Sequence, residues 1–254
     1  MCPAFSMPAA IEFRDVSLRI ADGRFLLHGI NLSLEEGTTT AVLGRSGSGK
    51  TTLLRMVNRM ADPTSGTVLI RGRECEQHNP IALRRGMGYV IQETGLFPHF
   101  SVERNVGLVP ELNGERISGE KTRELLAQVG LEAAQFAHRY PHQLSGGQRQ
   151  RVGLARALAA NPSILLMDEP FGALDPLTRA EMQDMLRNLL ARLKKTVLLV
   201  THDLDEALYL ASRIVLLEEG RVVTDVAAEN FLQSDTPAVK AYAEAFHRSR
   251  KEMR

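Results

Sequence analysis

The run Gly44–Thr51 has residue types and spacing that predict chemistry, because it matches G-x-x-x-x-G-K-[ST]. The β-branched, apolar segment Thr39–Leu43 before it predicts a buried strand, and residues 52–57 after it suit a helix. Glycines let a backbone wrap closely around phosphate, and the N–H groups of such a loop point at anionic oxygens. An ordinary Gly/Ser-rich turn would not combine all of these features. We therefore expect the following residues to bind phosphate: Gly44, Arg45, Ser46, Gly47, Ser48, Gly49, Lys50, Thr51 and Thr52.

Two adjacent carboxylates, Asp168 and Glu169, follow the apolar run Ile164–Met167, which predicts a strand buried on both faces of a parallel sheet. Beside a phosphate loop, we expect Asp168 to hold Mg²⁺ through water and Glu169 to polarise an attacking water. Lys50 would reach the β- and γ-phosphates, and Thr51 would give its hydroxyl to Mg²⁺. Neighbouring residues on an extended strand face opposite ways, so the two carboxylates need not share one task. Taken alone, the pair would more simply be solvated carboxylates at a strand end.

The run Leu144–Gln148 resembles the signature sequence of ATP-binding cassette (ABC) ATPases. Other motifs of that family follow its order: Gln92 resembles the Q-loop glutamine, Asp175 the D-loop aspartate and His202 the switch histidine. The resemblance extends from about residue 11 to residue 220. It implies a P-loop NTPase fold of the α/β class, with a mainly parallel sheet, an antiparallel β layer and a helical subdomain.

The resemblance also implies roles for these residues. Two copies would sandwich ATP head to tail, with the phosphate loop of one copy facing the signature residues Ser145, Gly146, Gly147 and Gln148 of the other. The glycines would leave a helix N-terminus open to the γ-phosphate. Glu169 and His202 would activate and orient water, and Asp175 would act across the dimer interface. Gln92 would assist catalysis and bind Mg²⁺ together with Thr51 and Asp168, so the expected cofactors are ATP and Mg²⁺.

Composition narrows the class of protein. The formal net charge is +1, from 31 basic and 30 acidic residues, so no global basic field indicates a nucleic-acid partner. The two cysteines, Cys2 and Cys75, predict no disulfide framework, and Cys2 is not expected to be lipidated. The first residues lack the features of a secretion signal. Because no apolar stretch reaches the ~20 residues of a membrane helix, transport would need separate membrane-spanning subunits.

Alternating patterns organise the chain into one expected ABC ATPase domain, 1–254. The core would comprise about 11–92 and 161–224, the helical subdomain about 93–160, and a helical tail about 225–254. The basic end Arg248–Arg254 suggests a solvated tail, with weak contact to a membrane surface as the alternative. The segments expected to be strands are Ile11–Leu18, Ile30–Leu34, Thr67–Ile70, Val197–Val200 and Ile214–Leu217.

The aromatic segment Gly95–Phe100, together with Gln92, is expected to bind a short helix of a transmembrane permease subunit; a local core is the alternative. Segments such as Arg55–Met60 and Leu83–Gln92 are similar to those of ABC importers of osmoprotectants, whose solutes are glycine betaine, choline, carnitine and related quaternary amines. An importer of amino acids or other small solutes, or a soluble ABC ATPase, remains the alternative. An importer implies a periplasmic or extracellular solute-binding protein and a peripheral location on the cytoplasmic face of the inner membrane.

Two departures from the family pattern modify these expectations. Many osmoprotectant cassettes continue into paired CBS-type domains, whereas this sequence ends at Arg254, so we expect no ionic-strength sensing by this subunit. The family usually places an aromatic residue, which stacks on adenine, where this sequence has Ile20. Phe25 is nearby but out of register. We therefore expect aliphatic contact alone to hold the base.

Overall fold

The computed structural model describes residues 9–92 and 94–252, with side chains described up to residue 246. The expectations about Cys2 and about the side chains of Arg248–Arg254 fall outside this described part. The chain forms two compact units. One comprises Met1–His78 and Leu198–Arg254, and the other comprises Asn79–Val197. The first unit contains the phosphate loop, and the second contains the carboxylate pair.

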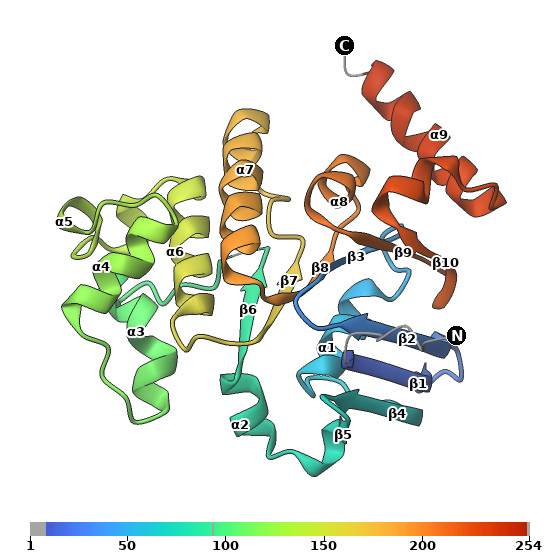
Figure 1. Cartoon of the computed structure of the whole chain (residues 1–254), viewed down its shortest axis with the longest axis horizontal. Coiled ribbons are helices and arrows are strands. Elements are labelled where there is room, and N and C mark those ends of the chain that lie inside the picture. The colour runs from blue at the N-terminus through green and yellow to red at the C-terminus, as the bar shows by residue number, and fades with distance from the viewer. Residues whose placement is uncertain (1–8, 93, 253–254) are drawn as a thin grey trace, which may run out of the picture. The chain divides into compact units, whose positions relative to one another are not determined.

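An antiparallel sheet with the strand order β2-β1-β4-β5 opens the first unit (Figure 1). Alternation along β1 places Ile11 and Phe13 in the core and leaves Glu12 partly exposed. This confirms the antiparallel layer expected from the sequence. The strands are β1 Ala9–Arg19, β2 Phe25–Glu35, β4 Ser65–Ile70 and β5 Arg73–Glu74.

The strand that leads into the phosphate loop, β3, is parallel to β9, and β9 is antiparallel to β10. Residues 40–43 of β3 are fully buried, as the apolar run predicted. Helix α1 begins directly at Lys50. The remaining elements of this unit are β3 Thr39–Leu43, α1 Lys50–Val57, the 3-10 helix η1 Cys75–Gln77, α8 Leu204–Leu210, β9 Arg213–Glu218, β10 Arg221–Ala227, the 3-10 helix η3 Ala228–Gln233 and α9 Pro237–Glu252.

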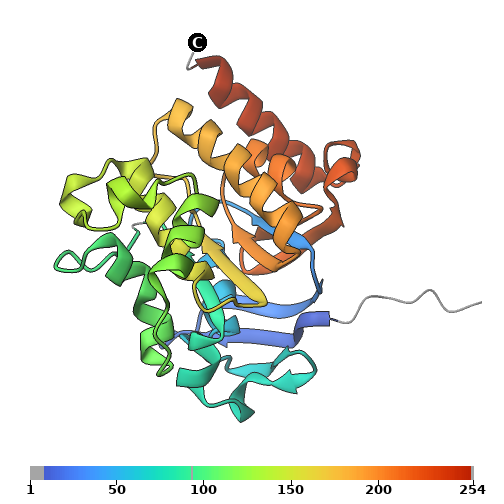
Figure 2. The same ribbon diagram turned by 60° about the vertical axis from the view of Figure 1, so that its left-hand side comes forward.

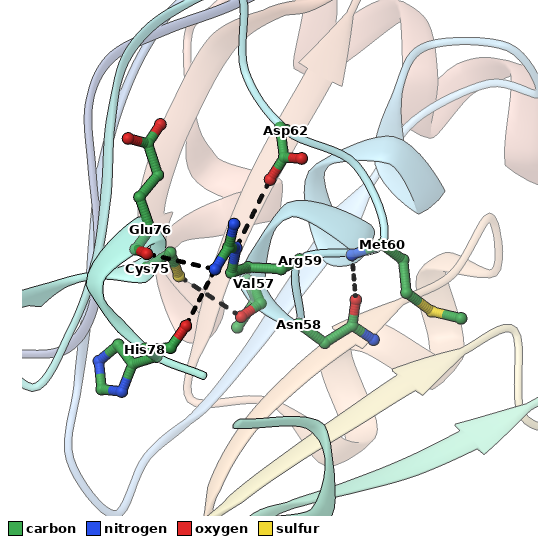
Figure 3. A network of polar contacts seen from close by, with 8 residues as sticks. All are labelled: Val57, Asn58, Arg59, Met60, Asp62, Cys75, Glu76 and His78. Carbon is green, nitrogen blue, oxygen red and sulfur yellow. Dashed lines mark hydrogen bonds and ion pairs between the residues drawn. The ribbon is translucent and has the colours of Figure 1, made fainter. Parts of the chain in front are cut away.

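The end of α1 is fastened to η1 by Arg59, which lies just after the helix with a φ of +54°. Its guanidinium donates to the carbonyl oxygens of Glu76 (3.3 Å) and His78 (2.9 Å) and lies 3.6 Å from a carboxylate oxygen of Asp62 (Figure 3). Beside it, the buried thiol of Cys75 donates to the carbonyl of Val57 at 3.6 Å. Bonds from the Arg59 and Cys75 side chains to backbone carbonyls therefore join the end of α1 to the segment up to His78.

Helices dominate the second unit, where α3 to α6 gather as the green-to-yellow group of Figure 2. Strands β6 and β7 form a parallel pair. The elements are α2 Pro80–Arg85, β6 Met87–Ile91, α3 Val102–Leu112, α4 Gly119–Gln128, α5 Ala133–Phe136, the 3-10 helix η2 Pro141–Gln143, α6 Gly146–Leu158, β7 Ile164–Asp168 and α7 Pro176–Leu193. Strand β8, Thr196–Val200, lies where the chain returns to the first unit and is buried throughout.

The helical region expected before β7 is observed, and its residues Leu125, Leu126 and Val129 are buried. The short helix α2 was not predicted, although its start signals are present: the Asn79 side chain accepts from two backbone N–H groups, and Pro80 occupies the first turn. None of the helices in the described part of the chain combines the length and apolar character that a membrane span requires.

Candidate active site

The phosphate loop connects β3 to α1 as the sequence predicted, and its lysine points back across the loop. The Lys50 amine donates to the carbonyls of Gly44 (2.8 Å) and Arg45 (3.0 Å), and only 5% of this residue is exposed. Thr51 and Thr52 lie in the first turn of α1, partly exposed. A pocket of about 210 Å³ opens against Gly44–Ser48.

Two glycines of the loop are required by close packing. A Cβ on Gly44 would collide with the carbonyl oxygen of Leu217, and one on Gly49 would lie 2.8 Å from the carbonyl oxygen of Leu26. Both residues also have positive φ values, +157° and +103°. The hydroxyl of Ser48 is buried on the wall of the pocket with no hydrogen-bond partner in the protein. An anionic ligand in this pocket would satisfy that hydroxyl, because phosphate oxygens accept hydrogen bonds.

The turn between β9 and β10 supports the phosphate loop through hydrogen bonds of Gly220. The N–H of Gly220 donates to the carbonyl of Ser48 (3.1 Å), and the carbonyl of Gly220 accepts from the N–H of His28 in β2 (2.8 Å). Gly220 has a φ of +75°, and a Cβ there would lie 2.5 Å from the carbonyl oxygen of Leu26. The contact of this turn with the phosphate loop was not predicted from the sequence.

His202 lies in the same unit, between β8 and α8, with an exposed side chain. The backbone around it is fixed: the N–H of Thr201 donates to the carbonyl of Val42 (3.2 Å), and the N–H of Asp203 donates to the Thr201 hydroxyl (3.0 Å). Val42 belongs to β3, one residue before the end of that strand. The His202 segment is therefore bound to the strand that precedes the phosphate loop.

Ile20 and Phe25 line one pocket of about 410 Å³ at the end of the β1–β2 hairpin. The Arg19 guanidinium lies 4.5 Å from the centre of the Phe25 ring. Leu26, the neighbour of Phe25, contacts the position of a Cβ on Gly49. An aromatic side chain that the sequence register had set aside thus lines the same pocket as Ile20.

The carboxylate pair belongs to the second unit. Asp168 is the last residue of β7, but Glu169 has a φ of +46°, in the left-handed region. The expectation that the two side chains would alternate along an extended strand was therefore wrong, because the strand ends between them. A non-glycine residue in this region is strained, and such strain is frequent at functional sites. Both residues are partly buried.

Gln92 lines a pocket of about 330 Å³ in the second unit, with Gly146, Pro170 and Leu174 among the other wall residues. Its amide nitrogen would be 2.9 Å from a Cβ on Gly172. The pocket thus brings the Q-loop glutamine together with the first residue of α6 and with neighbours of Glu169 and Asp175.

The signature residues Ser145–Gln148 form the capped start of helix α6. The Ser145 hydroxyl accepts from the N–H of Gln148 (3.2 Å), and the Gln148 side chain accepts from the N–H of Ser145 (3.0 Å). This reciprocal capping box involves the N–H groups of Ser145 and Gln148, and the anion contact expected at Gly146 and Gly147 stays a prediction. Packing accounts for Gly147, since a Cβ would lie 2.5 Å from the Thr178 side chain on α7.

Asp175 also caps a helix. Its carboxylate accepts a hydrogen bond of 3.0 Å from the N–H of Thr178, and Asp175 is the N-cap residue of α7. Hydrogen bonds from Thr178 lower the pKa of the fully exposed Asp175 carboxyl, so the carboxylate is charged at neutral pH.

Two residues of α6 that sequence reasoning missed support the loop after β6. Arg156 donates to the carbonyls of Thr94 (2.7 Å) and Gly95 (2.8 Å), and burial lowers the pKa of its guanidinium. Gln150, which is 3% exposed, donates to the carbonyl of Pro170 beside Glu169. The only signal in the sequence was the presence of long polar side chains on a helix whose other face is apolar.

Comparison with known proteins agrees with these features. The profile of the ABC transporter family matches residues 27–172. The chain is 43% identical over 226 residues to the choline transport ATP-binding protein OpuBA of Bacillus subtilis, covering 88% of this chain and 59% of the relative. It is 46% identical over 205 residues to the osmoprotectant import ATP-binding protein OsmV of Salmonella typhimurium (80% and 54%). It is 49% identical over 216 residues to the glycine betaine uptake system ATP-binding protein YehX of Escherichia coli (84% and 69%). The chain thus spans little more than half the length of the first two relatives.

Solved structures show the same fold. A dimeric ATP-binding cassette in a post-hydrolysis state, bound to ADP and Pi, superposes with a TM-score of 0.76 at 35% identity, covering 86% of this chain and 98% of the other. A cassette from Clostridium perfringens, part of an ABC transporter complex, superposes with a TM-score of 0.79 at 26% identity, covering 97% and 96%. The expected α/β class with a nucleotide-binding core is confirmed.

Proposed function

Because this chain belongs to the ABC transporter family, we propose that it is the ATP-hydrolysing subunit of an importer for a quaternary-amine osmoprotectant. The observation that carries the proposal is the loop Gly44–Thr51, in which two glycines tolerate no Cβ and a buried serine hydroxyl faces the pocket. The solute class rests on relatives whose names specify choline, osmoprotectant and glycine betaine transport.

In this proposal, Lys50 and the loop amides hold the phosphates of ATP. Glu169 polarises the attacking water, and His202 and Gln92 orient it. The donors that would hold Mg²⁺ are the Thr51 hydroxyl, the Asp168 carboxylate and the Gln92 amide oxygen, and such oxygen ligands fit that ion. Bound there, Mg²⁺ would neutralise charge on the phosphates.

A second copy of the chain would complete each site with Ser145–Gln148, and Asp175 would act across the interface. The dimeric cassette with 35% identity supports this arrangement. Because the Ser145 and Gln148 side chains cap α6, their role in a dimer would be to hold the start of this helix rigid. The single ABC domain would divide as expected from the sequence, with its core at about 11–92 and 161–224.

The proposed contact with a permease subunit is at Gln92 and the segment Gly95–Phe100. Phe97 is 48% exposed and stacks on Phe100 at 5.2 Å, so it does not form a buried core. Asn105, fully buried, bonds to the N–H and carbonyl of Phe97 and to the carbonyl of Phe100. A rigid loop with an exposed aromatic side chain suits the binding of a partner helix. The complex would include a solute-binding protein, with this chain on the cytoplasmic face of the inner membrane.

Reconstitution tests the proposal. The chain, its permease subunits and its solute-binding protein would be placed in proteoliposomes, and ATP hydrolysis and uptake would be measured with glycine betaine, choline, carnitine and a panel of amino acids. Stimulation by a quaternary amine supports the assignment. Stimulation by an amino acid alone would contradict the proposed solute class but would still agree with the proposed ATPase activity. A rate of ATP hydrolysis that does not change when the membrane partners are added would indicate a soluble ABC ATPase.

A further inference from the structure

Helix α9 contacts two parts of the candidate site within the first unit. Ala238, Ala241 and Tyr242 line the same pocket as the loop segment 44–48. The Tyr242 hydroxyl donates a hydrogen bond of 2.8 Å to the backbone carbonyl of His202, forty residues earlier in the chain. Figure 1 shows α9 beyond the β9–β10 hairpin, at the C-terminal end of the chain. No sequence motif connects this helix with the site.

The bond from Tyr242 completes the fixing of one peptide group. The carbonyl of His202 and the N–H of Asp203 belong to the same planar unit. The N–H side donates to the Thr201 hydroxyl at 3.0 Å, and the carbonyl side accepts from Tyr242. The tyrosine hydroxyl therefore restrains the carbonyl side of this peptide, as the Thr201 hydroxyl restrains the N–H side. Removing the tyrosine hydroxyl would weaken the restraint on this peptide, and therefore on the backbone that carries the imidazole.

We propose that Tyr242 is a positioning residue for ATP hydrolysis, which holds the His202 peptide so that the imidazole keeps one orientation. This inference rests on the function proposed above, because it assigns His202 to the hydrolytic step. Tyr242 acts through His202, and its hydroxyl does not need to touch the nucleotide. Tyr242 lies next to the phosphate-loop pocket, because it lines that pocket together with Ala238 and Ala241.

The hydroxyl can be removed without loss of the fold. Among the described side chains of α9, Val239 is the fully buried one, at 1% exposure, and it anchors the helix independently of Tyr242. Lys240 forms an exposed ion pair with Asp235 (2.7 Å) on the same helix start. Such exposed pairs contribute little to stability. Lys240→Ala is therefore a matched control that changes α9 without affecting His202.

The test compares steady-state and single-turnover ATP hydrolysis in the wild type, Tyr242→Phe and Lys240→Ala. Losing one hydrogen bond should lower kcat of Tyr242→Phe about two- to tenfold. The KM for ATP and the melting temperature should stay at wild-type values, and Lys240→Ala should match the wild type. A double-mutant cycle adds the decisive readout: in a His202→Ala background, Tyr242→Phe should lower the single-turnover rate no further.

Three results would overturn the inference. They are an unchanged kcat in Tyr242→Phe, an equal further loss in the His202→Ala background, and a similar fall in Lys240→Ala. The last would assign the effect to the attachment of α9 as a whole. Failure of the proposed function is distinguishable from these, because the wild type itself would then neither bind nor hydrolyse ATP.

Discussion

Gly220→Ala tests whether the β9–β10 turn supports the phosphate loop. The structure offers a matched control, Gly72→Ala, because both glycines occupy the second position of a two-residue hairpin loop. The preceding residues Glu219 and Arg71 have φ values of +46° and +50°, and the glycines have +75° and +77°. A Cβ on Gly72 meets no atom within 4 Å, whereas one on Gly220 lies 2.5 Å from the Leu26 carbonyl oxygen.

The left-handed conformation alone costs an alanine about 1–2 kcal/mol, and this term is common to both variants. Only Gly220 must also move away from β2. That movement would break its bonds with the Ser48 carbonyl and the His28 N–H, each worth about 0.5–1.5 kcal/mol. We therefore expect Gly72→Ala to lower the free energy of unfolding by about 1–2 kcal/mol and Gly220→Ala by about 2–5 kcal/mol.

Urea denaturation followed by circular dichroism measures both values, and the binding of a fluorescent ATP analogue measures the functional consequence. Gly220→Ala should weaken nucleotide binding, because the Ser48 carbonyl lies within the loop, and Gly72→Ala should leave it unchanged. Equal losses of stability in the two variants, with equal nucleotide affinity, would refute the claim that the turn supports the loop.

Three further predictions concern the site and a buried thiol. Glu169→Gln should bind ATP, hydrolyse it at least about a hundredfold more slowly and accumulate as an ATP-dependent dimer in gel filtration; hydrolysis at the wild-type rate would contradict the assigned role. Phe25→Ala should weaken ATP and GTP similarly, by up to about 1–3 kcal/mol, if the ring stacks on the base beside Ile20; unchanged affinity for both would show that another group holds the base. Burial raises the pKa of the Cys75 thiol from 9.0 to about 11, so its contribution to stability is complete below pH 9.0 and is lost as the pH rises towards about 11. In a Cys2→Ser variant, iodoacetamide should therefore modify Cys75 only in the unfolded chain, and rapid modification of the native protein at pH 8 would contradict this.

Local patterns predicted the parts of the site that depend on local structure. The phosphate loop followed from a buried strand, glycines and a helix start within about twenty residues. The capping box at Ser145 was equally visible, as Ser-x-x-Gln, but only the glycines between these two residues were interpreted. The strand pattern that located Asp168 could not show that the backbone turns left-handed at Glu169.

Contacts between segments that are distant in the chain could not be predicted from sequence patterns. The support of the loop by Gly220 depends on β2, nearly two hundred residues earlier, and the bond from Tyr242 to His202 joins a terminal helix to a loop. Neither interaction leaves a periodic trace in composition or spacing. Phe25 was set aside because its position was counted along the sequence from Ile20. The β1–β2 hairpin brings the two residues to the same pocket.

The hydrogen bonds of the Arg59 side chain couple the two ends of one segment mechanically. Helix α1 starts at the residues proposed to grip phosphate, and its far end is bonded through Arg59 to the carbonyl of His78, the last residue of the first unit before the chain crosses to the second. The segment between α1 and His78 is therefore restrained by these bonds. A displacement of α1 at its phosphate-binding end would therefore be transmitted to His78 instead of being absorbed along residues 60–77.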